Sequence, residues 1–436
     1  MKSTHIGLAG LIFCACTTLD PKDSMTPTRH PYPESPRGDV VDTYHGEKVA
    51  DPYRWLEDLD SPETRKWVEA QNEVTFAHLG TLPTRELLRE RIAEHWNYTR
   101  YGIPFERNGR YFFSKNDGLQ NQSVLYWSES LSGEPRVLLD PNTLSEDGTV
   151  ALSRYSVSNN GKLLAYGLSA SGSDWITWHV RNIDTGEDLP DTLEWSKFSG
   201  ASWLEDDSGF FYSSYDAPKE GEEYEEANYF QKLYLHRLGT AQSADELVFE
   251  DRDHKDWGFG GSVTDDGAYL VISVWRGTEE RNLLHVKRLS DGKLFPLVTE
   301  WKFDYRFIDN DGETFYLVTD DGAPRRRIVA VDLDTPESLT TVVGEKSEVL
   351  QGATLFGDEI YGVYLRDAHT VVERMNLAGE TVGTLDFPGL GTAYGFGGER
   401  GDTETFFSFE SYGQPSTIYR YDIAKKTASV WKQPEV

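Results

Sequence analysis

GAYLVIS at residues 267–273 and HVKRLSDGK at residues 285–293 are the two sequence patterns that decide the fold. The first opens with a turn glycine and continues as an apolar strand, and the second is a strand that ends in an aliphatic residue before a turn. Each pattern recurs seven times, and the two alternate along the chain. The first pattern begins at Gly109, Gly161, Gly209, Gly267, Gly312, Gly357 and Asp402. The second has its aliphatic residue at Leu131, Ile183, Leu238, Leu289, Leu333, Leu377 and Ile423.

The spacing of these aliphatic residues gives the length of one repeat. Successive members lie 44 to 55 residues apart, which is the length of a unit of four antiparallel strands. Such units arranged around an axis protect strand edges that a long open sheet would expose. We therefore predict a mainly β fold, a seven-bladed β-propeller over residues 98–432. A pair of β-sandwiches with accidental spacing is the alternative.

A short helical segment at residues 41–97 precedes the repeats. Ser61-Pro62-Glu63 predicts a helix start, because serine caps a helix and proline suits its first turn. Apolar side chains then recur at helical spacing in two stretches, first at Trp67, Ala70, Val74 and Ala77, and then at Leu88, Ile92 and Trp96. Two short helices with broad apolar faces need a further packing partner.

The first 40 residues differ in composition from the rest of the chain. Lys2 precedes an apolar stretch at residues 6–15, which is too short to span a bilayer and is typical of a signal peptide. Residues 13–16 loosely match a bacterial lipobox, in which Cys16 would carry lipid after cleavage. We predict a signal peptide at 1–15, a proline-rich linker at 16–40, and export to the periplasm or an outer-membrane lipid anchor. A misassigned start and a cytoplasmic location are the alternatives.

Composition excludes several classes of function. The formal charge of −30 argues against nucleic acid as a partner, because phosphates require a basic surface. The only cysteines are Cys14 and Cys16, the ten histidines form no zinc-binding spacing, and no G-x-S-x-G nucleophile motif is present. We therefore predict no catalytic residue, no metal site and no cofactor within this sequence. The acidic run at residues 220–226 indicates a solvated loop rather than a cation site.

Several long strings follow one another in the order found in a known enzyme family. They are YHG at 44–46, DPYRWLED at 51–58, VEAQN at 68–72, GLQNQSVLY at 118–126, LLDPNTLSEDGTVAL at 138–152, GLSASGSDW at 167–175 and QKLYLHRLGTAQSADEL at 231–247. On these strings the chain resembles the prolyl oligopeptidase (prolyl endopeptidase) family of serine peptidases. The resemblance extends from about Tyr32 to the end.

The resemblance implies a two-domain enzyme that cleaves short peptides after proline. A propeller covers an α/β-hydrolase domain, restricts access to the enclosed cavity and supplies a few apolar side chains to the substrate. Residues 41–97 would be the N-terminal part of the hydrolase domain. Local alignment places Phe198 and Phe259 at the substrate-binding positions, although both also suit a packed core. In the same alignment, Trp275 occupies the position of a family arginine that lies over the substrate, and Arg276 follows it.

The sequence departs from the family pattern at its end. In the family, the catalytic serine, aspartate and histidine follow the propeller, whereas this sequence ends at Val436. A peptidase needs both nucleophile and base, so we expect the N-terminal portion of such an enzyme, inactive alone. A stand-alone propeller that binds peptides or proteins is the first alternative. The second is one half of a split peptidase, active in trans with a separately encoded hydrolase domain.

Overall fold

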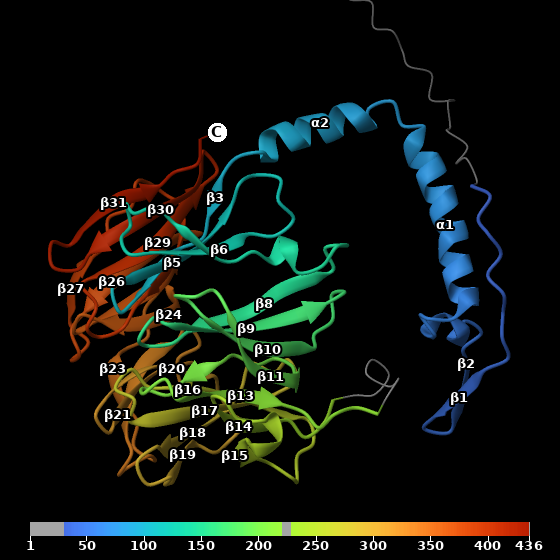
Figure 1. Cartoon of the computed structure of the whole chain (residues 1–436). Helices are drawn as coiled ribbons and strands as arrows, with labels where there is room; N and C mark the ends of the chain where they lie inside the picture. The colour runs from blue at the N-terminus through green and yellow to red at the C-terminus, as the bar shows by residue number, and fades with distance from the viewer. Residues whose placement is uncertain (1–29, 220–227, 436) are drawn as a thin grey trace, which may run out of the picture. The chain divides into compact units, whose positions relative to one another are not determined.

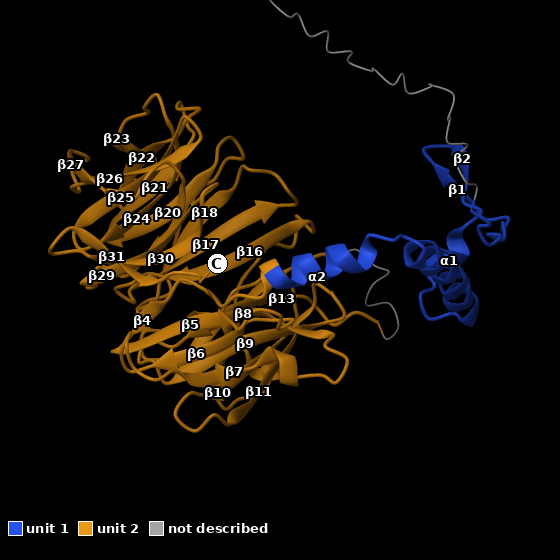
Figure 2. Cartoon of the chain, turned by 90° about the horizontal axis from the view of Figure 1, so that it is seen from above, with its two compact units in different colours: residues 1–94 blue, residues 95–436 orange. Residues whose placement is uncertain are grey.

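The computed structural model describes residues 30–219 and 228–435. The expected signal peptide, Cys16 and the acidic run at 220–226 lie outside the described residues. The chain divides into two compact units, Met1–Glu94 and His95–Val436, which Figure 2 shows in different colours. Each unit is described by itself.

The first unit contains a hairpin and helices. Strands β1 (Val41–Tyr44) and β2 (Glu47–Ala50) pair antiparallel through a two-residue turn, His45-Gly46, in which both residues have positive φ, as hairpin turns of this length require. After the 3₁₀ helix η1 (Arg54–Glu57) comes α1 (Pro62–Gly80). The hydroxyl of Ser61 caps α1 by accepting from the Thr64 N–H at 3.1 Å, so the predicted helix start is confirmed.

Helix α2 (Arg85–Trp96) begins in the first unit and ends in the second. Its apolar residues Leu87, Leu88, Ile92 and Trp96 are exposed. An exposed apolar face of this kind gives a short helix little tertiary stabilisation. No helix in the described part of the chain combines the length and apolarity that a membrane span requires.

The second unit consists of antiparallel sheets whose strands follow one another in chain order (Figure 1). One sheet has five strands: β3 (Arg100–Tyr101), β4 (Phe105–Arg107), β5 (Arg110–Asn116), β6 (Val124–Ser128) and β7 (Arg136–Leu139). Two sheets of four strands are β16 (Trp257–Val263), β17 (Tyr269–Arg276), β18 (Leu283–Arg288), β19 (Leu294–Val298), and β20 (Tyr305–Asp311), β21 (Thr314–Thr319), β22 (Arg327–Asp332), β23 (Thr340–Val343). Two more are β24 (Val349–Phe356), β25 (Glu359–Arg366), β26 (His369–Met375), β27 (Thr381–Thr384), and β28 (Thr392–Gly397), β29 (Glu404–Ser411), β30 (Gln414–Asp422), β31 (Thr427–Lys432).

The remaining strands form one eight-stranded sheet. They are β8 (Val150–Val157), β9 (Leu163–Ala170), β10 (Ile176–Asn182), β11 (Asp188–Ser196), β12 (Ser202–Trp203), β13 (Gly209–Ser214), β14 (Lys232–Arg237) and β15 (Glu246–Glu250). The join is the single pair Ser196–Ser214 between β11 and β13. It forms because β12, which would otherwise cover that edge of β13, is only two residues long.

The prediction of seven separate blades is therefore wrong. Over the described residues the propeller has five sheets of blade size and one of eight strands. The two halves of the eight-stranded sheet pack against each other. Trp178 and Leu193 from one half share a buried cluster with Trp203 and Phe210 from the other. Similar clusters fill the space between consecutive sheets, so the core lies between the sheets, as in a propeller.

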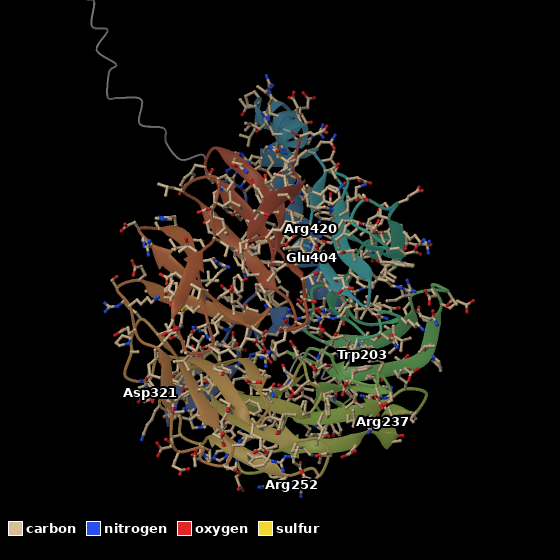
Figure 3. The ribbon with its side chains drawn as sticks, turned by 90° about the vertical axis from the view of Figure 1, so that its left-hand side faces the viewer. Trp203, Arg237, Arg252, Asp321, Glu404 and Arg420 are labelled. Atoms are coloured by element: carbon tan, nitrogen blue, oxygen red, sulfur yellow. The ribbon has the colours of Figure 1, made fainter. Side chains whose placement is uncertain are left out.

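The first and last sheets of the second unit lie side by side and close the ring. Tyr111 on β5 donates a hydrogen bond to Glu404 on β29 at 2.6 Å, and Glu404 also pairs with Arg420 (Figure 3). The indole N–H of Trp431 donates to the Leu131 carbonyl at 3.2 Å. Each of these hydrogen bonds has a side-chain donor, and they join residues about 300 positions apart in the sequence.

Candidate functional site

A cavity of about 770 Å³ lies where β16 begins and β17 ends. We call it the Phe198 cavity. It is lined by Arg154, Phe198, Ser199, Gly200, Tyr215, Asn228, Asp256, Gly258, Trp275, Gly277 and Thr278. Its volume lies within the range of pockets that hold small molecules or short peptide segments.

Phe198 is presented to this cavity by an unusual backbone. Its side chain is 57% exposed, and its φ is +55°, while Trp195 three residues earlier has φ +57°. Bulky residues rarely adopt this left-handed conformation, and surrounding contacts must hold them in it. The hydroxyl of Ser199 accepts from the Ser213 N–H at 2.8 Å, and the side-chain amide of Gln231 donates to the Lys197 carbonyl at 2.7 Å. The residues on both sides of Phe198 are therefore fixed.

Phe259 has a different environment from Phe198. Its side chain is completely buried, in a cluster with Leu233, Leu270 and Ile272. Its backbone is held as well, because the Phe259 N–H donates to the Gln231 side-chain oxygen at 2.7 Å. A ring without exposed surface cannot contact a ligand in this conformation. The substrate contact expected for Phe259 therefore stays a prediction, and of the two phenylalanines only Phe198 lines the cavity.

Trp275 forms another wall. It pairs with Gly258 across β16 and β17, and a Cβ on Gly258 would lie only 2.3 Å from the indole nitrogen. A Cβ on Gly260 would lie 3.2 Å from the same ring system. The two glycines therefore make room for the indole over the strand. Arg276 does not line the cavity, because its guanidinium pairs with Glu279 at 2.6 Å and lies over the Trp301 ring.

Tyr215 completes the aromatic lining. Burial raises the pKa of its phenol to about 12, so it carries its proton at neutral pH and can donate a hydrogen bond. Behind it, the Trp175 ring packs against Tyr215 with centroids 6.0 Å apart, and the Lys197 ammonium lies 4.3 Å from the centroid of Trp175. Burial lowers the pKa of Lys197.

A second, smaller cavity lies at the opposite ends of the same strands. Its volume is about 210 Å³, and charged residues from four of the sheets and their loops line it, including Arg107, Glu205, Asp265 and Glu399. Arg107 and Glu399 pair across it at 3.2 Å. Partial burial and the nearby Asp309 carboxylate raise the pKa of Asp265 to about 6. We call this region the Asp265 end.

The loop between β28 and β29 links neighbouring sheets at the Asp265 end. The guanidinium of Arg400 donates to the Asn310 carbonyl at 3.3 Å and pairs with Asp311 at 3.0 Å and Asp358 at 3.3 Å. Burial raises the pKa of Asp309, of Glu399 and of Asp402. The loop thereby connects three sheets through charge-assisted hydrogen bonds, a stronger class than neutral ones.

A buried histidine is the polar feature that sequence reasoning missed. His236 on β14 is completely buried and contacts Asp245 at 2.7 Å and Asp191 at 2.9 Å through its two ring nitrogens. Both contacts raise its pKa against the opposing effect of burial. No cavity described above reaches it, so it ties strands together rather than binding a ligand. Among the described residues, no three His, Cys, Asp or Glu side chains form a metal-binding group.

Comparison with known proteins places this geometry in a family. Residues 33–434 match the family model described as prolyl oligopeptidase, N-terminal beta-propeller domain. A prolyl endopeptidase of Elizabethkingia meningoseptica is 40% identical over 408 residues, which cover 93% of this chain and 57% of that protein. Prolyl oligopeptidase A of Galerina marginata is 32% identical over 438 residues, covering 92% of this chain and 59% of that protein.

Solved structures agree. A prolyl endopeptidase structure from a study of inter-domain dynamics in catalysis and specificity aligns with a TM-score of 0.86 and 33% identity, covering 93% of this chain and 60% of the other. Prolyl oligopeptidase B of Galerina marginata, bound to a 35-residue hydrolysis and macrocyclization substrate, aligns with a TM-score of 0.84 and 28% identity. The chain thus spans about three fifths of the length of these relatives.

Proposed function

The chain belongs to the prolyl oligopeptidase family, whose N-terminal propeller domain it carries, and from this premise we propose that it serves a serine peptidase that cleaves short peptides after proline. In this proposal the Phe198 cavity binds peptide residues on the N-terminal side of the cleaved bond. One observation carries it: Phe198 is exposed in a strained backbone conformation that a buried hydrogen-bond network maintains. An aromatic side chain held out in this way is suited to contact an apolar ligand.

The propeller further controls which peptides reach the catalytic centre. The β28–β29 loop and its ion pairs at the Asp265 end support this proposal, because they restrict that end of the strands. The partner is an α/β-hydrolase domain, in cis or in trans, and residues 41–97 are part of it. Leu390, Tyr394 and Tyr412 are exposed close to the start of β28 and the end of β29, and their apolar surface supports a docking role for this part of the propeller.

The described residues bind and admit substrate and do not themselves cleave it. Within residues 30–219 and 228–435 no serine hydroxyl is hydrogen-bonded to a histidine, an arrangement that activates a serine nucleophile. The purified chain is therefore expected to show no turnover of a Gly-Pro chromogenic peptide. Turnover at a rate typical of enzymes, abolished by a serine-directed phosphonate, would contradict this.

Peptide binding by the chain tests the role of the cavity. Phe198→Ala should weaken binding of a short proline-containing peptide about 3- to 10-fold, because it removes one aromatic wall. Phe230→Ala is the matched control, since Phe230 is also exposed with φ +57° but does not line the cavity. Isothermal titration calorimetry measures both. Equal losses in the two variants would refute a ligand role for Phe198.

A stand-alone peptide-binding module is the second candidate. It is favoured by the aromatic lining of the Phe198 cavity, in which Phe198, Tyr215 and Trp275 offer ring surface to a peptide. Adding a separately expressed hydrolase domain to the chain distinguishes the two candidate functions. Restored cleavage of the Gly-Pro peptide supports the peptidase, and binding without any restored cleavage supports the module.

Export remains a proposal of its own, with Cys16 as the lipid acceptor, and it rests on the sequence alone. Labelling cells with a radioactive fatty acid tests it. Incorporation that is lost in Cys16→Ser supports the lipid anchor, whereas an unlabelled, unprocessed chain contradicts it.

A further inference from the structure

Arg154 is the basic residue of the Phe198 cavity. It lies on β8 with an exposed side chain that lines the cavity. Over residues 30–219 and 228–435, it is the only arginine whose side chain has no ion pair, no hydrogen bond and no aromatic contact. Most arginines of the chain are paired. Arg181 on β10, for example, forms an ion pair with Asp188 at 2.8 Å.

An unpaired arginine is unexpected in this protein. Acidic residues outnumber basic ones by 73 to 43, so most guanidinium groups find a carboxylate nearby. A guanidinium has five N–H donors in a planar fork that matches a carboxylate. In Arg154 all of these donors stay open to a ligand that enters the cavity.

The rest of the lining limits what that ligand is. Phe198 and Trp275 offer apolar ring surfaces, and the protonated phenol of Tyr215 offers one further donor. Asp256 is the only carboxylate in the lining, and the structure gives it no ion pair or hydrogen bond either. Its charge repels an anion on its own side of the cavity. A negatively charged group of the ligand is thereby directed to Arg154.

We propose that Arg154 is a specificity-determining residue that receives a carboxylate of the bound peptide, so that the cavity favours peptides with aspartate or glutamate shortly before the proline. This inference rests on the proposed peptide-binding role of the same cavity. It adds a charge preference that the aromatic walls alone do not provide.

The expected effect is modest because Arg154 is exposed. Exposed ion pairs contribute roughly 0.2–1 kcal/mol, and the bidentate geometry open to arginine favours the upper part of that range. A preference of about 3- to 5-fold in Kd for a peptide with glutamate over the same peptide with glutamine is therefore expected. Because both partners remain solvated, the preference should decrease as salt concentration rises.

The test titrates the full chain with short proline-containing peptides that are acetylated and amidated, so that their ends carry no charge. The peptides differ only at one of the three positions before the proline, which holds glutamate, glutamine or lysine. Calorimetry should show glutamate binding more tightly than glutamine, and lysine binding most weakly, in at least one position. Arg154→Gln should remove the difference between glutamate and glutamine. Arg154→Lys should keep part of it, because charge remains without the planar fork.

Arg252→Gln is the matched control, since it removes one positive charge from an exposed arginine that lies outside the lining. It should leave the glutamate preference unchanged. If peptides bind but glutamate and glutamine are equal at every position, or if Arg252→Gln acts like Arg154→Gln, the inference is overturned while the cavity remains a peptide site. If no peptide binds at all, the proposed function fails, and the inference fails with it.

Discussion

The two ends of the propeller strands are built with different chemistry. At the Phe198 end, neutral hydrogen bonds fix the backbone. They are made by the buried residues Ser199, Ser213 and Gln231. At the Asp265 end, ion pairs such as Arg400–Asp311 do so, among carboxyl groups of raised pKa. Buried neutral hydrogen bonds fix geometry at all ordinary pH values, whereas ion pairs respond to pH and salt. The difference fits the ligand role proposed for the first end, and it makes the second end the one whose stability should depend on pH and salt.

The largest expected effect comes from removing the buried network at the Phe198 end. Gln231→Ala leaves the Lys197 carbonyl and the Phe259 N–H without partners, because Gln231 is completely buried between them. Leaving buried polar groups unsatisfied lowers the free energy of unfolding by about 2–4 kcal/mol. Thermal denaturation should show a clear fall in Tm.

Gln242→Ala is the control for that experiment. Gln242 also bonds to a backbone carbonyl, that of Glu194 at 3.0 Å, but it is partly exposed, so water replaces the lost bond. Its cost should stay below about 1 kcal/mol. Equal destabilisation by the two substitutions would show that the Phe198 end has no special rigidity.

A smaller effect is expected from charge at the Asp265 end. The folded-state pKa of Asp265 is about 6, above its ordinary value of 3.8, so the folded protein binds this proton more tightly than the unfolded chain does. Stability should therefore rise as pH falls from 8 towards 5. Asp265→Asn should raise the free energy of unfolding at pH 8 by about 0.5–1 kcal/mol, after allowance for solvent screening, and should flatten this pH dependence.

Asp266→Asn supplies a control of opposite sign. Burial acts to raise the pKa of Asp266, but hydrogen bonds from Thr264, Ala268 and Asn310 lower it overall. Its carboxylate is thus favoured in the folded state, and its loss should destabilise the protein at pH 8. Urea denaturation at pH 5 and pH 8 measures both variants. Stabilisation by both substitutions would mean that only net charge matters.

The smallest effect should come from the Arg107–Glu399 pair. Both side chains are partly exposed, and such pairs contribute little. Arg107→Gln should lower the free energy of unfolding by less than about 0.5 kcal/mol at low salt, and the loss should vanish near 1 M NaCl. A larger, salt-independent loss in urea denaturation would show that Arg107 acts through packing instead.

Much of the fold could be predicted from sequence, because it is encoded locally. Turn pairs such as Asn108-Gly109, in which both residues have positive φ, mark where strands meet, and the repeat spacing marks the sheets. The joining of two expected blades could not be predicted. The two halves pair at one position only, Ser196 with Ser214, and no local sequence pattern predicts that pairing.

The candidate site was less accessible to sequence reasoning. Phe198 came from resemblance, and nothing local indicates its exposure. The sequence does contain a signal that Phe259 is buried. Phe259 alternates with Gly258 and Gly260 along β16, so the two glycines lie on one face of the strand and Phe259 lies on the other. The sequence gives no signal for Gln231, just before β14, or for Arg154 on β8, because a polar residue in or next to a strand usually faces water. Only the structure shows that Gln231 is buried and that Arg154 is unpaired.

The single bridge between Ser196 and Ser214 has a mechanical consequence for ligand binding. Phe198 lies two residues beyond that bridge, within the chain crossing from one half of the large sheet to the other. A hinge motion between these halves would therefore move the backbone that carries the phenylalanine ring. A ligand pressed against the ring would resist that bending, so occupancy of the cavity should stiffen the propeller along this line and slow amide exchange in both halves together.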